Sequence, residues 1–371
     1  ATFANPFPNL GLPSEFPKVP IVPNIAQLAA GAAPISGFFM DPNMRTPYAS
    51  QFGLNIQWEF AKDFLAEIGY VGTKGTKLIQ QVRIAQAQLA SPTRPINGIT
   101  ENTPANAALR SPFVGFSPDG LKQFQTSGNS TYHSLQLTVS KRLSRGLQLL
   151  AAYTFSKWLD DRTTITGLQG DATAFAPGDQ TRLSLNKGRS DADRRHRFVI
   201  SGTYDLPKVG RGVVGAVLSN WEVAWIATLQ SGRPIDIRDS NGASLFGVTT
   251  SRASWAPQAT RQTASRKGSV TSRLNQFFNT SAFVPAGPGF GTVGRNVLSG
   301  PDQRNVDLSI LKRIPLREAH TLEFRAEFFN AFNIVNFANP GSDISQSATF
   351  GVITQTSTSP RIVQFALRYS F

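Results

Sequence analysis

The sequence predicts an all-β fold, an antiparallel transmembrane β-barrel with long extracellular loops. Three observations point to it: stretches of strand length that alternate apolar and polar residues, connections that alternate between short and long, and a last strand that ends on an aromatic residue. Such a barrel suits a membrane because, where water is absent, every backbone polar group needs a partner within the protein.

The final stretch, residues 361–371, carries the alternation most clearly. Its apolar and aromatic residues share one parity, and polar residues hold most of the other positions. The apolar set is Val363, Phe365, Leu367, Tyr369 and Phe371. A soluble sheet rarely ends its chain on such a strand, because the outer backbone groups would need another partner. In a barrel the last strand closes the ring, with aromatic side chains at the membrane interface.

The same alternation recurs upstream of this strand. It is clearest in residues 52–60, 135–139, 221–229 and 322–328, and further candidates are residues 64–71, 147–155, 198–205 and 306–312. We expect about nine strands, most of roughly 9–11 residues, the length that a tilted strand needs to cross a bilayer. A soluble sandwich would also alternate, so the repetition favours a barrel and no single strand does.

The connections between these strands alternate in length. Short links are predicted at residues 61–63, 144–146, 207–219 and 313–320, and long links at 72–131, 157–197, 231–305 and 333–360. Outer-membrane barrels have short periplasmic turns and long outside loops, whereas long structureless loops are uncommon in compact soluble domains. We therefore assign residues 51–371 to the barrel and residues 1–50, which are rich in proline, to an extracellular loop segment.

Composition narrows the functional classes. The chain has no cysteine, which excludes a disulfide scaffold, a thiolate metal site and a cysteine nucleophile. Its net charge is +14, but the basic residues are scattered through the predicted loops and form no nucleic-acid-binding module. We expect no nucleic-acid partner, because an anionic lipopolysaccharide surface accounts for these charges.

Charged residues on the polar parity of the strands are candidates for a lumen surface. These are Glu59, Glu222, Glu323, Arg325 and Glu327. In a plugged barrel, inward charges contact the plug domain or line a water-filled lumen, and we prefer this interpretation to catalysis. The three histidines lie far apart in the sequence and no catalytic motif is present. We expect no enzyme activity, no cofactor and no metal.

Aspartates near the predicted loop ends allow two interpretations. Asp160, Asp161, Asp191 and Asp193 could form a calcium site, but we favour hydrogen bonds at the loop ends with nearby arginines. The consecutive residues Asp193, Arg194, Arg195, His196 and Arg197 precede a strand, and we interpret them as a signature of fold and register rather than a ligand site. Aromatic residues of the long loops could contact a ligand or pack the loops together: Phe113, Phe116, Phe124, Trp255, Phe277, Phe278 and Phe290.

Ten blocks of the chain, in order, carry a family resemblance. They are residues 41–48, 57–60, 67–76, 132–142, 153–157, 193–198, 202–207, 230–234, 304–309 and 324–333. Together they resemble the TonB-dependent receptors of the Oar-like type, which have a carboxypeptidase-regulatory-like domain. The resemblance implies a barrel of about 22 strands, preceded by the regulatory-like domain, a TonB box and a plug domain.

The resemblance also implies a role. The chain would be the C-terminal part of a receptor in the bacterial outer membrane, and its outer loops would capture a ligand for uptake through the plugged lumen. Implied partners are outer-membrane lipid and lipopolysaccharide, the plug domain missing from this chain, a TonB-type energy-coupling protein acting through the missing N-terminal part, and the barrel-assembly machinery. No cleavable leader begins at Ala1, so we expect Ala1 to begin a partial chain.

Two other functions stay open at this point. The barrel could be a non-transporting envelope anchor or adhesin, or the chain could be a soluble all-β binding or hydrolytic domain. The soluble alternative requires that the outward faces of the strands are buried against a second sheet.

Overall fold

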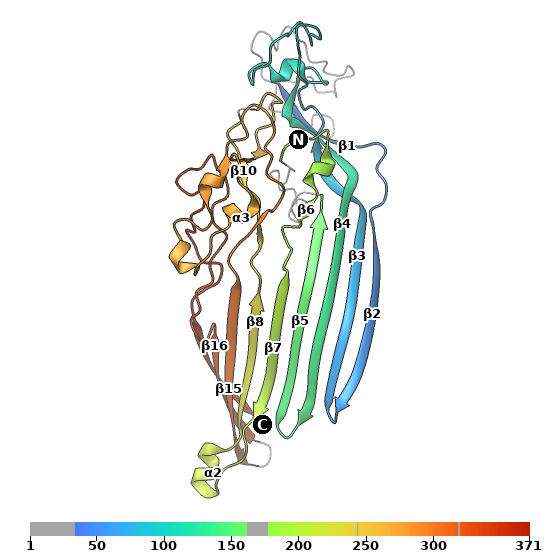
Figure 1. The fold of residues 1–371 in the computed structure, drawn as a ribbon. Helices are drawn as coiled ribbons and strands as arrows, with labels where there is room; N and C mark the ends of the chain where they lie inside the picture. The colour runs from blue at the N-terminus through green and yellow to red at the C-terminus, as the bar shows by residue number, and fades with distance from the viewer. Residues whose placement is uncertain (1–33, 162–176, 243, 318–319) are drawn as a thin grey trace, which may run out of the picture.

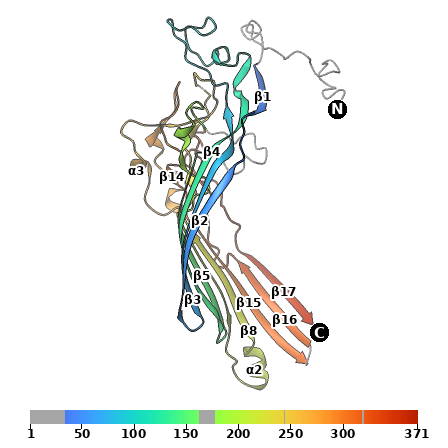
Figure 2. The same ribbon diagram turned by 90° about the vertical axis from the view of Figure 1, so that its right-hand side faces the viewer.

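The computed structural model describes residues 34–161, 177–242, 244–317 and 320–371. Its dominant feature is one long, curved sheet (Figures 1 and 2), in which nine strands follow one another in chain order and each pairs with the next. They are β2 (Tyr48–Ala61), β3 (Phe64–Arg83), β4 (Phe116–Ser144), β5 (Leu147–Asp160), β7 (His196–Asp205), β8 (Trp221–Gln230), β15 (Gln303–Arg317), β16 (His320–Phe329) and β17 (Ile362–Ser370). Every neighbouring pair among them is antiparallel.

Each stretch predicted as a strand overlaps one of these strands, but two strands are much longer than expected. β3 has 20 residues and β4 has 29, so much of the predicted loop 72–131 is paired strand. The sequence there lacks the period-2 pattern because polar residues occupy both parities, yet backbone pairing continues. Likewise β1 (Ile35–Met40) lies in the segment predicted as a loop and pairs parallel to β4.

The two ends of the sheet differ in the length of their connections. We call the end with the long connections the loop end and the other the turn end. Figure 1 shows the loops gathered at one end, while the C-terminus and the short helix α2 (Gly212–Leu218) lie at the other. In the described residues no helix has the length and apolar character needed to cross a membrane. The predicted link 313–320 is shorter than expected, because β15 continues to Arg317.

Strand register gives the sheet one apolar and one polar face. A row of paired residues across the apolar face is Val139, Ala151, Ile200, Ala227 and Val306. The corresponding row one residue away holds Thr138, Ala152, Val199, Thr228 and Asn305 on the polar face. Many large apolar side chains remain exposed, as with Leu367, whose side chain is 69% exposed. No second sheet covers the apolar face within the described chain.

Aromatic pairs mark both ends of the apolar face. Each histidine of the chain shares a hydrogen bond with a tyrosine hydroxyl, and the two rings stack. The pairs are Tyr70 with His133 (2.7 Å), Tyr153 with His196 (2.8 Å) and Tyr369 with His320 (2.6 Å). Two pairs lie toward the loop end and one at the turn end. Amphipathic aromatic rings at two levels are typical of the interfaces that border a membrane.

The buried apolar cluster that forms the core lies in the loops. Residues of the connections β8–β15 and β16–β17 form it, and its largest members include Phe277, Phe278, Phe283 and Phe350. Short elements frame this loop layer: β9 (Pro234–Ile235), β10 (Arg238–Asp239), β11 (Ser251–Arg252), β12 (Ser254–Trp255), α3 (Arg261–Ala264), η4 (Thr271–Arg273), η5 (Thr280–Ala282), β13 (Phe283–Val284) and β14 (Leu298–Ser299). Further short elements at the loop end are η1 (Ala107–Arg110), η3 (Leu183–Asn186) and β6 (Gly188–Arg189).

The loop aromatics therefore divide between packing and exposure. Phe277 and Phe278 are buried in the loop core, and Trp255 stacks on Phe283 at a centroid distance of 5.1 Å. Phe113 is exposed. Close backbone packing also explains one of the family-like blocks: a Cβ at Gly232 would lie 1.9 Å from the carbonyl oxygen of Gly300, so only glycine fits there.

The two faces can be tested with neighbouring single cysteines, because the chain has no cysteine of its own. Ser309 lies on the polar face and Ile310 on the apolar face of β15. We expect a bimane label on Ile310→Cys to be strongly quenched in vesicles of lipid with brominated acyl chains, and a label on Ser309→Cys to be little affected. Equal quenching at both positions would contradict this assignment of the faces.

Candidate functional site

Four of the five predicted lumen-facing residues form one ladder of ion pairs on the polar face. Arg313 of β15 contacts Glu222 of β8 at 2.7 Å and Glu323 of β16 at 3.8 Å. Arg325 continues the ladder, at 2.9 Å from Glu323 and 3.7 Å from Glu327. The ladder fixes these charges across three strands near the turn end. Because the arginines are partly exposed, it contributes little to stability, but it gives the polar face an ordered charge pattern.

The fifth residue, Glu59, stands apart from the ladder. It lies on β2 opposite Leu65 and shares the polar face by register, but four strands separate β2 from β8. Sequence reasoning missed Arg313, which joins the two halves of the ladder, because this residue was assigned to a link. The available signal was parity, because Arg313 shares the parity of the polar residues Asp307 and Ser309.

The run Asp193–Arg197, predicted as a signature of fold and register, connects β5 to the loops. Asp193 is fully buried, and its carboxylate accepts hydrogen bonds from the Trp158 backbone amide at 2.8 Å and from Arg189 Nε at 2.9 Å. Arg194 donates to the carbonyl of Ser231 at 2.5 Å. These contacts hold the chain before β7 against the end of β5 and the start of the next loop.

The remaining members of the signature lie in or next to β7. The Arg195 guanidinium lies 5.7 Å from the ring centroid of Phe155, and His196 pairs with Tyr153 as described above. Arg197 is in register with Thr154 on β5. The run thus supplies contacts with β5 on both faces of the sheet.

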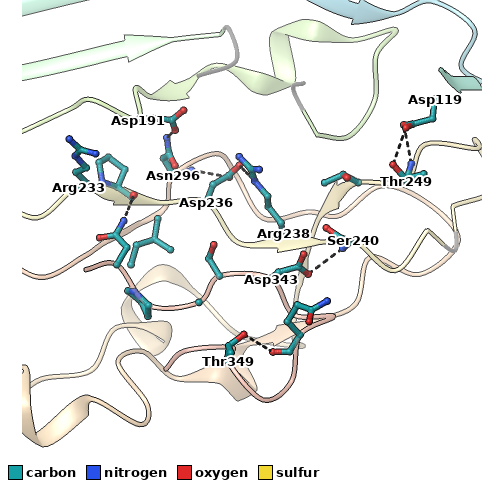
Figure 3. A pocket seen from close by; sticks show the side chains of 18 of the residues that line it. Asp119, Asp191, Arg233, Asp236, Arg238, Ser240, Thr249, Asn296, Asp343 and Thr349 are labelled. Atoms are coloured by element: carbon teal, nitrogen blue, oxygen red, sulfur yellow. Dashed lines mark hydrogen bonds and ion pairs between the residues drawn. The ribbon is translucent and has the colours of Figure 1, made fainter. Parts of the chain in front are cut away.

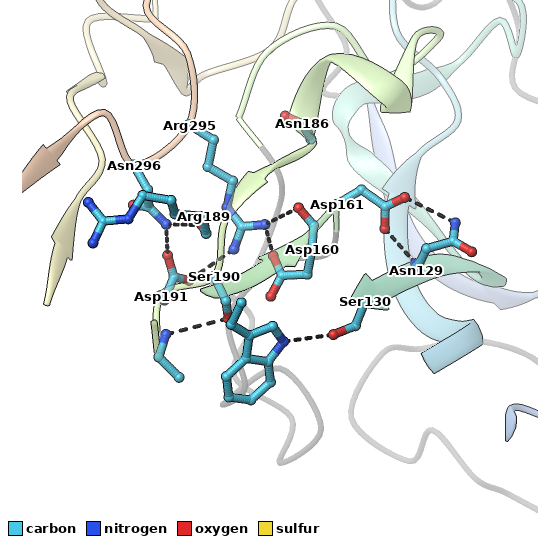
Figure 4. A network of polar contacts seen from close by, with 12 residues as sticks. Asn129, Ser130, Asp160, Asp161, Asn186, Arg189, Ser190, Asp191, Arg295 and Asn296 are labelled. Atoms are coloured by element: carbon cyan, nitrogen blue, oxygen red, sulfur yellow. Dashed lines mark hydrogen bonds and ion pairs between the residues drawn. The ribbon is translucent and has the colours of Figure 1, made fainter. Parts of the chain in front are cut away.

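A second polar network joins the sheet to the loop layer (Figure 4). The buried Arg295 pairs with Asp160 at the end of β5 and with Asp191 at 3.4 Å. Asn296 donates to Asp191 at 2.6 Å, while Asp161 accepts from Asn129. Asp160 and Asp191 bond to an arginine, as favoured from the sequence, whereas Asp161 bonds to asparagine. Within the described chain, no group of three or more metal-ligating side chains could hold a metal ion.

Above the sheet, the loop end holds a cavity of about 720 Å³ (Figure 3). The ends of β3 and β4 supply part of its wall, and the connections β8–β15 and β16–β17 supply most of the rest. Its charged side chains are four basic and four acidic: Arg83, Lys122, Arg233, Arg238, Asp119, Asp191, Asp236 and Asp343. Serine, threonine, asparagine and glutamine side chains form most of the remaining lining, together with Pro234, Ile235, Pro340 and Gly341. None of the described lining residues is aromatic.

Several charges of the cavity are balanced within its wall. Arg83 lies 2.7 Å from Asp119, and Asp236 lies 3.0 Å from Arg252 and 3.4 Å from Arg238. Such a lining suits a hydrophilic ligand that can hydrogen-bond to fixed polar groups.

At Asp343, burial tends to raise the carboxyl pKa, but hydrogen bonds from Ser240 and Ser345 outweigh it and lower the pKa below its ordinary value. The carboxylate therefore stays ionised in the cavity at neutral pH.

Sequence reasoning did not find this cavity. Its lining residues range from Arg83 to Thr349 and come together only through the packing of loops. One family-like block, residues 230–234, did include two of them, Arg233 and Pro234.

Comparison with known sequences decides the family. The profile described as "Outer membrane beta barrel domain" matches residues 1–364. The chain belongs to this family. This outer-membrane barrel domain is located in the bacterial outer membrane, which removes the soluble alternative. No curated protein sequence matches it.

Solved structures similar to this chain include the following three, the first of which is an outer membrane transporter. The transporter YddB from Escherichia coli is 11% identical with a TM-score of 0.46, covering 91% of this chain and 35% of that chain. FpvA from P. aeruginosa, bound to heterologous pyoverdines, is 12% identical with a TM-score of 0.44, covering 91% and 29%. The FrpB iron transporter from Neisseria meningitidis is 12% identical with a TM-score of 0.40, covering 90% and 33%. The barrel domain thus spans about a third of these chains.

The contribution of the Arg295 ion pairs to the joint, the contact between the loop layer and the sheet, can be tested by mutation. Replacing it by methionine leaves the buried Asp160 carboxylate without its cation, and breaking a buried pair costs about 3–5 kcal/mol. We expect Arg295→Met to open the loop end locally, measured as faster hydrogen exchange at the Ser190 amide, which donates to the carbonyl of Trp158. The control Arg313→Met removes a half-exposed cation and should cost at most about 1 kcal/mol. Similar exchange in both variants would show that the Arg295 pair does not hold the joint.

A pH dependence is expected at Asp179. Burial raises its pKa, but hydrogen bonds from Thr181, Gln86 and Arg182 outweigh burial and lower the pKa to about 2. Because the folded pKa is depressed, the stabilisation is complete above the unfolded value of about 3.9 and is lost as the pH falls toward 2. Hydrogen exchange at the Gln180 amide, which is bonded to Gln86, should therefore accelerate below pH 4 beyond the intrinsic rate. In Asp179→Asn, exchange should be fast at neutral pH and lack this step.

Proposed function

We propose that this chain is the C-terminal part of a TonB-dependent receptor of the Oar-like type, with a barrel of about 22 strands. In this proposal its loop cavity captures a hydrophilic ligand outside the cell. The ligand then passes the polar face of the barrel when an energised TonB-type protein displaces the plug. The role is binding and transport, without catalysis.

The observation that carries the proposal is the alignment of the cavity with the polar face. The cavity lies at the loop end and the ladder near the turn end, and the face between them is polar. The Asp193–Arg197 run and the Arg295 network hold the loop layer in place above the sheet. A ligand bound in the cavity would therefore enter a lumen with an ordered polar wall.

The two edges of the sheet support a larger ring. In the described chain the outer sides of β2 and β17 are unpaired. Because each of the nine strands is antiparallel to the next, β2 and β17 run in the same direction, and pairing them directly would be parallel. An odd number of further strands restores antiparallel closure. A total of about 22 strands meets this condition, since it leaves about 13 to be added.

The partners follow from this placement. Lipid and lipopolysaccharide surround the apolar face, and the barrel-assembly machinery inserts the strands. The plug domain and the TonB box belong to the N-terminal part of the receptor.

The plug contact gives the test. In the intact receptor in cell membranes, a benzoylphenylalanine at position 203, on the polar face, should photo-crosslink to a plug segment encoded upstream of Ala1. The same group at position 204, on the apolar face, should give no crosslink to protein. Both positions are partly buried in the same strand, so the comparison isolates the face.

The reading frame upstream of Ala1 distinguishes the receptor proposal from the remaining alternative, a non-transporting anchor or adhesin. A plug domain and a TonB box there, with the crosslink at position 203, support transport. If the frame encodes neither and position 203 gives no protein crosslink, the chain is a non-transporting anchor or adhesin and the receptor proposal is wrong.

A further inference from the structure

The helix α2 at the turn end is apolar on all sides. Its sequence, Gly-Val-Val-Gly-Ala-Val-Leu, contains no polar side chain and none of its residues is buried. Val213 is 81% exposed, and Val214, Val217 and Leu218 are about half exposed or more. The other turns that connect the strands at this end contain no helix in the described residues. An exposed apolar patch of this kind marks a contact surface.

The helix is attached to the apolar face of the sheet. Trp221 and Lys312 are paired residues on that face, and both donate hydrogen bonds to the end of α2. Trp221 Nε1 reaches the Val217 carbonyl at 2.9 Å. Lys312 Nζ reaches the carbonyls of Ala216 at 2.8 Å and Val217 at 3.0 Å, and also that of Ser219.

These contacts suit a membrane boundary. Lys312 is only 5% exposed, and its ammonium lies 5.2 Å from the centroid of the Trp221 ring. A charge on a lipid-facing surface is tolerated when its donors are satisfied by backbone carbonyls and it lies near the interface. Lys312 meets both conditions, and it joins the helix to the surface that faces lipid.

Two exposed cations precede the helix. Lys208 and Arg211 lie in the segment between β7 and α2. Basic residues beside an apolar helix can contact lipid phosphates while the apolar side chains enter the boundary between headgroups and acyl chains. In outer-membrane barrels the short turns face the periplasm, where the adjacent leaflet consists of phospholipid.

We propose that α2 is an interfacial anchor that inserts its valine side chains into the phospholipid leaflet at the turn end. The anchor continues the apolar face of the sheet beyond the end of the strands. It is independent of ligand uptake and follows from the outer-membrane location together with the contacts of Trp221 and Lys312.

Spin labels test the anchor directly. The intact protein, in vesicles of phosphatidylethanolamine and phosphatidylglycerol, is labelled at Val213→Cys or Val217→Cys, with Lys62→Cys in the β2–β3 turn as the water-exposed control. We expect the ratio of collision with oxygen to collision with a water-soluble nickel chelate to be several-fold higher at positions 213 and 217 than at 62. Ratios equal to that at 62 would overturn the proposal. Low collision with both reagents would also overturn it, because it would place the helix against protein.

The attachment has its own matched variants. Lys312→Met removes the donor to α2, and Lys141→Met removes the corresponding lysine of the β4–β5 turn, which donates to Ser144 and Leu147 carbonyls. The oxygen-to-nickel ratio at position 213 should fall toward the control value in Lys312→Met and stay unchanged in Lys141→Met. An unchanged ratio in Lys312→Met would contradict the assigned role of this lysine.

Discussion

Backbone pairing between neighbouring strands is the constraint on which the rest of this structure depends. In lipid an unpaired amide or carbonyl has no water to replace its partner, so the strands must remain in register along their length. A slip by one residue would exchange the apolar and polar faces completely. The contacts of the Asp193–Arg197 run matter for this reason: Asp193 fixes the end of β5, and His196 begins the pairing of β7 opposite Phe155.

The same constraint explains the charges on the apolar face. Lys141 and Lys312 lie on it close to the turn end. Each donates to backbone carbonyls beside the neighbouring strand connection while its ammonium lies over an aromatic ring. These carbonyls replace the water that the charge of each lysine would otherwise need. Position along the strand decides whether such a charge is tolerated: near the interface it completes a turn, whereas at mid-membrane it would lack partners.

The sequence predicts the strands and their faces, because these depend on the parity of apolar residues. It does not predict sites that form where folding joins distant segments. Alternation located the strands and placed Glu222, Glu323 and Arg325 on a common face. It did not predict the outer parts of β3 and β4, which are polar on both faces and yet paired. Arg313 was missed because a charged residue near a turn looks like part of the turn. The cavity was out of reach because Arg83, Arg238 and Asp343 meet only after three connections have packed.

The loop layer and the sheet are held together by different forces, and this difference bears on function. The loops have an apolar core of their own around Phe278 and Phe283, whereas contacts between that layer and the sheet include the buried pair of Arg295 with Asp160. Buried ion pairs add little net stability but tolerate few geometries. They therefore set the orientation of the loop layer, while the loop core supplies its cohesion. A cavity built in this way keeps its shape and a fixed direction toward the polar face, as the proposed delivery of a hydrophilic ligand to a lumen would require.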